Sequence, residues 1–194
     1  MVAVARTARS KKEGQVVYPQ VLDGLIDAAW TLLQPSGVAV ATETSTGWHL
    51  IGAAASYQHF LALADTGLAR EAHPCGSTPQ ADKLLAAALI LLGQRVDLVA
   101  IDMPLSHVPI TGRGTSDNAV SRAYGARNCG THTPSVLRPG SISDDLQASF
   151  TTCGYPLQTL EINTPGLIEV YPHPALVELA SAQERLPSPV KANA

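Results

Sequence analysis

The sequence predicts one α/β domain with a mixed five-stranded sheet, whose first three strands are antiparallel, flanked by helices. Three short apolar runs follow one another early in the chain, and two later apolar runs alternate with helical patterns. The chain of 194 residues has the length of one domain, and 45% hydrophobic residues suffice to bury a core. We expect this domain over residues 18–185, between a disordered basic tail over 1–17 and a C-terminal tail over 186–194.

The first three predicted strands form a meander. Their apolar runs are separated by two short segments rich in turn-forming residues, Pro35-Ser36-Gly37 and Ser45-Thr46-Gly47, which favours antiparallel pairing. The strands are expected over Val21–Trp30, from Gly37 as GVAVAT and from Trp48 as WHLIGAA. A first helix is predicted over 56–63, because its apolar side chains have helical spacing and a serine precedes them as an N-cap.

The second half of the chain alternates helices and strands. After a loop over 65–78, the segment Pro79–Gly93 predicts a helix, since it opens with proline and closes with glycine. The segment VDLVAID (96–102) is apolar almost throughout, which is typical of a strand buried on both faces. The remaining predictions are helices over 115–126 and 141–153, an ordered loop over 127–140, a strand over 166–171 and a short helix through residue 180.

Composition limits the class of protein. The formal net charge of −3 gives no broad positive field for coating a duplex, so contact with nucleic acid would be local. Three distant cysteines cannot all pair within the chain, which favours a reducing compartment. No segment reaches the roughly 18 uninterrupted apolar residues of a membrane span. We therefore expect a soluble cytoplasmic protein without a membrane partner.

Three acidic residues lie within or at the ends of predicted strands. Asp27 follows LI in the first strand, Asp102 ends VDLVAID, and Glu169 lies in LIEVYPHP. A charge in such apolar surroundings is costly unless it binds a cation or finds donors, and a carboxylate-only cluster favours Mg²⁺ or Mn²⁺ over zinc. The alternatives are that Asp27 caps the loop before Thr31 and that Asp102 merely ends a strand. The three can converge only if their strands are neighbours.

Asp117 has a different setting, near the start of the helix predicted over 115–126. The simplest interpretation is a favourable interaction with the helix N-terminus, with Ser116 as an alternative cap, and metal binding is the other. Asp117 is the single acid of a basic segment over 103–140. The arginines of this segment could hold phosphates or be merely solvated, and they are Arg113, Arg122, Arg127 and Arg138.

Two histidines are candidates for accessory roles. His132 in THTPS and His173 in YPHP could each orient a water molecule or donate a proton to a leaving group, although histidines in such turns more often bind backbone carbonyls. The chain contains no H-E-x-x-H, P-loop or G-x-S-x-G motif, and Ser36 is followed by a predicted strand rather than a helix. Zinc protease, P-loop NTPase and α/β-hydrolase chemistry therefore lack support.

Several segments together resemble the domain of unknown function 429 family, predicted nucleases with an RNase H-like fold. The segments are GLIDAAWT with PSGVAV, GWHLIGAA with SYQHFLAL, VDLVAIDMPLS, GRGTSDNAVSRAYGARNCGTHTPS and IEVYPHPAL. The resemblance extends over roughly residues 20 to 190. Its most specific pieces are IDMPLS, the R-x-x-x-D segment from Arg113 to Asp117, and EVYPHPAL.

The resemblance implies a metal-dependent nuclease acting on nucleic acid. In it Asp27, Asp102, Asp117 and Glu169 would be the catalytic acids, with Asp27, Asp102 and Glu169 as ligands of Mg²⁺ or Mn²⁺. Two metals about 3.5 to 4 Å apart would clamp the scissile phosphate for in-line attack by water, and we assign Arg113 and Arg122 as phosphate contacts. Relatives usually continue past ERLPSPVKANA into a helical region, so we expect a shortened C-terminal region.

Two other functions stay open at this point. A phosphotransferase of the actin and sugar-kinase type also begins with a three-stranded meander and an aspartate, but it would need a glycine-rich phosphate-binding turn after the first strand. The segment AAWTLLQPSG is a poor candidate for that turn. The second alternative is a non-catalytic interaction domain that has kept the fold.

Overall fold

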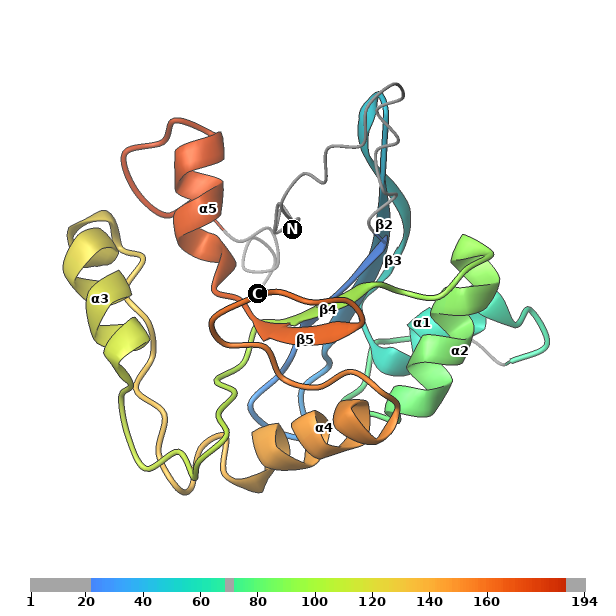
Figure 1. Cartoon of the computed structure of the whole chain (residues 1–194), viewed down its shortest axis with the longest axis horizontal. Helices are drawn as coiled ribbons and strands as arrows, with labels where there is room; N and C mark the ends of the chain where they lie inside the picture. Colours follow the sequence, from blue (N-terminus) through green and yellow to red (C-terminus); the bar gives the residue numbers. More distant parts are fainter. Residues whose placement is uncertain (1–21, 69–71, 188–194) are drawn as a thin grey trace.

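The computed structural model describes residues 22–68 and 72–187 (Figure 1). The predicted tail over 1–17, Val21 of the first predicted strand, and residues 188–194 of the predicted C-terminal tail lie outside the described residues. Within the described ranges no helix combines the length and the hydrophobicity that crossing a membrane requires.

The protein has an α/β fold built on one mixed five-stranded sheet, as predicted. The strands are β1 (Leu22–Asp27), β2 (Gly37–Thr44), β3 (Gly47–Ala54), β4 (Leu98–Ile101) and β5 (Gly166–Glu169). Their order is β3-β2-β1-β4-β5. The first three strands pair antiparallel, whereas β4 runs parallel to β1 and β5 runs parallel to β4. The sheet therefore brings the last two strands directly beside the first.

Three helices pack against one face of the sheet, and two others stand beyond the ends of β4 and β5 (Figure 1). The packed helices are α1 (Tyr57–Ala64), α2 (Ala81–Leu92) and α4 (Ser141–Thr152), and the outlying helices are α3 (Thr115–Tyr124) and α5 (Pro172–Leu179).

Several predicted boundaries differ from the structure. The first strand ends at Asp27 rather than Trp30, and the last ends at Glu169 rather than Tyr171. The helix expected from Pro79 begins at Ala81, because Gln80 is extended and acts as its N-cap. The helix expected through Ala126 ends as an α-helix at Tyr124 and tightens into a 3₁₀ turn over Gly125–Arg127. The left-handed backbone of Asn128, with φ of 58°, stops the turn there.

Strand β4 is buried on both faces, as its apolar sequence predicted. Val99 and Ile101 join the main core beneath α1, α2 and α4, whereas Leu98 and Ala100 pack with Ile168 on the opposite face. Full burial of such side chains stabilises the fold by about 1.5–3 kcal/mol each. The strand that leads into Asp102 is therefore held firmly from both sides.

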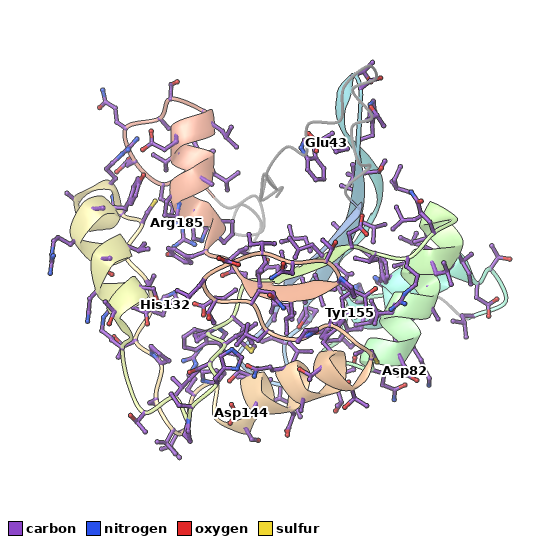
Figure 2. The ribbon with its side chains drawn as sticks, viewed as in Figure 1. Glu43, Asp82, His132, Asp144, Tyr155 and Arg185 are labelled. Carbon is purple, nitrogen blue, oxygen red and sulfur yellow. The ribbon has the colours of Figure 1, made fainter. Side chains whose placement is uncertain are left out.

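A buried hydrogen bond ties the end of α4 to the segment before β4. The hydroxyl of Tyr155 donates to the carbonyl oxygen of Val96 at 2.7 Å, and only 2% of Tyr155 is exposed. Figure 2 shows Tyr155 on the α2 side of the molecule, away from His132 and Arg185, which lie near α3 and α5. This bond stabilises the start of β4 at the end of the sheet opposite Asp102.

Candidate functional site

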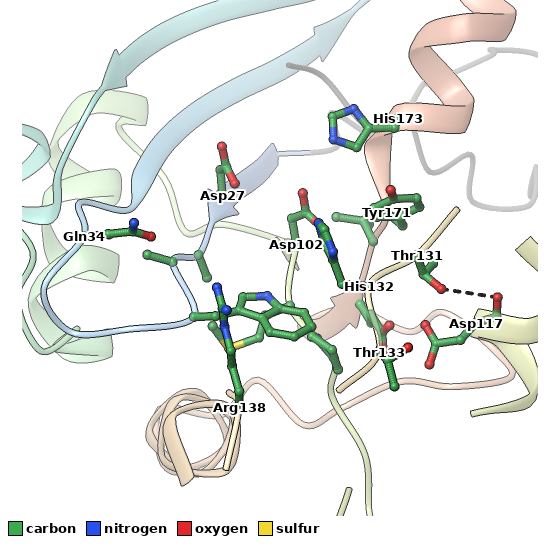
Figure 3. Close-up of a pocket in the computed structure, with 17 residues that line it drawn as sticks. Asp27, Gln34, Asp102, Asp117, Thr131, His132, Thr133, Arg138, Tyr171 and His173 are labelled. Atoms are coloured by element: carbon green, nitrogen blue, oxygen red, sulfur yellow. Dashed lines mark hydrogen bonds between the residues drawn. The ribbon is translucent and has the colours of Figure 1, made fainter. Parts of the chain in front are cut away.

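Two aspartates lie side by side where neighbouring parallel strands end. Ile26 of β1 pairs with Ile101 of β4, and the backbone N–H of Asp102 donates to the carbonyl oxygen of Ile26 at 2.8 Å. The residues that follow this pair, Asp27 and Asp102, therefore share one face of the sheet. Figure 3 shows both carboxyl groups pointing to the same side. The structure thus brings together the first two predicted acids.

Glu169 reaches the same edge from the other face of the sheet. It pairs with Ile101 rather than with Asp102, so strand alternation directs its side chain away from the face that carries Asp27. The Glu169 carboxylate accepts a hydrogen bond from the backbone N–H of Leu105 at 3.0 Å. This offset is consistent with another observation: within residues 22–68 and 72–187, no three His, Cys, Asp or Glu side chains are grouped so as to hold a metal ion.

A pocket of about 430 Å³ opens at this edge of the sheet. All four predicted acids and both predicted histidines line it, although they come from β1, β5, α3, α5 and the intervening loops. The four acids are Asp27, Asp102, Asp117 and Glu169, and the histidines are His132 and His173. Figure 3 shows the labelled lining residues. Segments far apart in the sequence thus contribute polar side chains to one concave site.

Asp102 has the most perturbed carboxyl group of the pocket. Its pKa is raised from 3.8 to about 7, mainly by burial and in addition by the nearby carboxylates of Asp27 and Glu169. The guanidinium of Arg185 opposes the shift only in part. Ionisation of this acid at neutral pH is therefore less favourable than that of an ordinary aspartate, and a nearby cation would favour it.

The pKa values of two neighbouring groups are also shifted. Burial raises the pKa of Glu169, with Asp117 acting in the same direction and the hydrogen bond from Leu105 opposing it. Burial lowers the pKa of His173 below 6.5, and Arg185 lowers it further. The imidazole of His173 is consequently neutral at pH 7 and can accept a proton.

Asp117 caps its own helix. Gly114 is the N-cap of α3, and its backbone N–H donates to the Asp117 carboxylate at 2.9 Å. This confirms the predicted interaction with the helix N-terminus, with Gly114 rather than Ser116 as the cap residue. The Asp117 carbonyl accepts a hydrogen bond from Thr131 at 3.3 Å (Figure 3). The side chain still lines the pocket, so capping and ligand contact are compatible.

The two arginines predicted to contact phosphate lie outside the lining of the pocket. The Arg113 guanidinium donates within the protein, to the Asp117 carbonyl at 2.9 Å and to the Ser121 and Thr131 hydroxyls at 2.6 and 2.8 Å. Arg113 therefore joins α3 to the loop after it. Arg122 is exposed on α3.

The pocket also includes residues beyond the predicted acids and histidines. Trp30, Tyr171 and Arg138 line it, and Arg185 lies close enough to influence the pKa of Asp102. Arg138 belongs to the basic segment over 103–140, and Trp30 ends the first predicted strand, so the sequence contains features that point to both residues. No sequence feature points to Arg185, because its position near the pocket depends on the fold of the chain after α5.

The donor set fits a hard divalent cation in its chemistry. Asp27 and Asp102 share a face, and their oxygens are of the type that Mg²⁺ and Mn²⁺ prefer. The raised pKa of Asp102 reflects burial first and the like charges of Asp27 and Glu169 second, and a cation would offset both. No protein-family model, curated protein or solved structure gives a match to this chain.

Proposed function

We propose that this protein is a member of the domain of unknown function 429 family with an RNase H-like fold, and that it hydrolyses phosphodiester bonds in nucleic acid with Mg²⁺ or Mn²⁺. The single observation that carries the proposal is the pairing of Asp27 with Asp102 at the ends of two adjacent parallel strands. The mixed five-stranded sheet that begins with three antiparallel strands supports the fold, since it is the sheet that the family resemblance implies.

Asp27 and Asp102 would hold the cation, and Glu169 and Asp117 would act from the rim of the same pocket. A bound divalent cation supplies positive charge that stabilises the phosphate and lowers the pKa of water. The protein adds two groups of its own. His173 is neutral and can take a proton, and Arg138, which is exposed on the pocket wall, can bind a phosphate oxygen.

The test is cleavage of labelled single-stranded DNA, duplex DNA and RNA in the presence of Mg²⁺ or Mn²⁺. We expect the wild type to cleave. Asp27→Asn and Asp102→Asn should each lower the cleavage rate by more than the factor of about 10 to 100 that is typical when a residue supporting a metal ligand is changed. The matched control is Asp145→Asn, an exposed aspartate on α4 that does not line the pocket. Wild-type rates in Asp102→Asn would refute the assignment.

Inactivity of the wild type on every substrate would have a different meaning. It would favour a non-catalytic interaction domain if metal binding were also absent. Cleavage that persists in a chelator would show that the reaction needs no metal. Proton transfer by Asp102 would then be the chemistry that the site contributes.

A further inference from the structure

Trp30 offers a fixed aromatic surface inside the pocket. It lies three residues beyond the end of β1, is half-buried and packs against the main core. Its loop is anchored by the backbone N–H of Ala29, which donates to the buried Ser36 hydroxyl at 3.0 Å. The His132 ring meets the indole edge-on, at 6.0 Å between centroids and 74° between planes. Rigid rings of this kind are the surfaces on which unpaired bases stack.

Arg138 places a cation beside this ring. Its guanidinium carbon lies 6.0 Å from the centre of the Trp30 ring, and the residue is exposed. A tight turn holds its backbone, since the Ser135 N–H donates to the Arg138 carbonyl at 2.7 Å. Within the described part of the chain, the Arg138 guanidinium makes no hydrogen bond, whereas the Arg113 guanidinium donates to several internal acceptors. Arg138 is thus available for a phosphate.

The two loops that meet through Trp30 and Arg138 also carry exposed apolar side chains. Leu33 is 91% exposed in the first loop, and Leu137 is 92% exposed in the second, directly before Arg138. The faces of bases are exposed in an unpaired strand and can contact such side chains, whereas a regular duplex keeps them stacked inside. These loop tips therefore favour an unpaired strand over a duplex.

The size of the pocket also supports binding of an unpaired strand. Its volume of about 430 Å³ lies near the lower end of the roughly 300–1,000 Å³ that small-molecule sites occupy. This space suits one nucleotide, and enzymes that act inside such pockets take single strands or extrude the target nucleotide. We propose, building on the proposed function, that the pocket holds one nucleotide of an unpaired strand, with its base stacked on Trp30 and its phosphate beside Arg138.

Tryptophan fluorescence tests this inference. The chain has two tryptophans, so a Trp48→Phe background leaves Trp30 as the only tryptophan, whose fluorescence is excited selectively over that of the tyrosines. Trp48 lies in β3, away from the residues that line the pocket. Ca²⁺ replaces Mg²⁺ to slow hydrolysis. Under these conditions we expect a five-nucleotide oligothymidylate to bind, as measured by quenching, at least about 10-fold more tightly than a blunt duplex. Arg138→Gln should weaken binding of the oligonucleotide about 10-fold, whereas Lys83→Gln, an exposed control on α2, should not.

Thymidine without any metal separates this inference from the proposed function. The nucleoside carries no charge, so millimolar thymidine should quench Trp30 even if the acids never bind a cation. Quenching by thymidine without metal-induced stabilisation would therefore support base stacking while the nuclease proposal fails. Metal binding without quenching by any probe would overturn the inference alone. Equal affinity for the oligonucleotide and the duplex would also overturn it.

Discussion

Replacing Asp102 with asparagine should stabilise the metal-free protein at alkaline pH. The raised pKa of Asp102 means that the native state binds this proton more tightly than the unfolded chain does. The free energy of unfolding of the wild type therefore falls as the pH rises from about 4, the unfolded pKa, to about 7, the native pKa. Asparagine keeps the shape of the side chain without this charge.

The difference between 3.8 and about 7 corresponds to about 4 kcal/mol as an upper bound. Water at the half-buried carboxyl screens the charge. At pH 8.5 we therefore expect the free energy of unfolding of Asp102→Asn to exceed that of the wild type by on the order of 2 kcal/mol. At pH 5 this difference should be smaller, at about two thirds of that value, because the titration is then incomplete.

The assay is urea unfolding in a chelator at pH 5 and pH 8.5, with the wild type, Asp102→Asn and the control Asp145→Asn. The control is expected to stay within about 0.5 kcal/mol of the wild type at both values of pH, because it is exposed on α4. Equal effects of Asp102→Asn at the two values of pH, or a variant less stable than the wild type at pH 8.5, would refute the argument from desolvation and like charge.

Three further predictions concern stability. Tyr155→Phe should cost about 1–2 kcal/mol in urea unfolding, since it leaves the Val96 carbonyl without its buried donor; no change would show that water replaces the bond. Leu146→Ala on α4, where only 1% of the side chain is exposed, should cost about 2–5 kcal/mol through the cavity it leaves; a loss below 1 kcal/mol would mean that the core relaxes. Arg113→Lys should lower stability by about 1–2 kcal/mol because lysine cannot reproduce the bonds to Ser121 and Thr131. It should leave any metal-induced rise in the thermal midpoint intact, and loss of that rise would assign Arg113 to the site.

Much of the fold could be predicted from local sequence patterns. The run VDLVAID has no polar residue between its two aspartates, so burial of β4 on both faces follows from its composition. The turn at Ser45-Thr46 joins β2 to β3 directly, as the sequence predicted, whereas a longer loop over 28–36 joins β1 to β2. Parallel pairing of β1 with β4 then places Asp27 and Asp102 at one edge.

The rest of the site depends on long-range geometry that the sequence does not contain. The register between β4 and β5 directs Glu169 to the face opposite Asp102, and a shift of one residue would have reversed it. The internal role of Arg113 depends on a loop that returns after α3. The position of Arg138 over Trp30 likewise requires two loops more than 100 residues apart to meet.

The most direct test of the central claim is the thermal midpoint of unfolding with and without 10 mM Mg²⁺ or Mn²⁺. A cation at about 100 times its dissociation constant should stabilise the wild type by about 2.7 kcal/mol, or roughly 5–10 °C. We expect the same rise in Asp145→Asn and no rise in Asp27→Asn or Asp102→Asn. A wild-type midpoint that does not respond to either cation, or an equal rise in Asp102→Asn, would contradict the assignment of this acidic pair as a metal site.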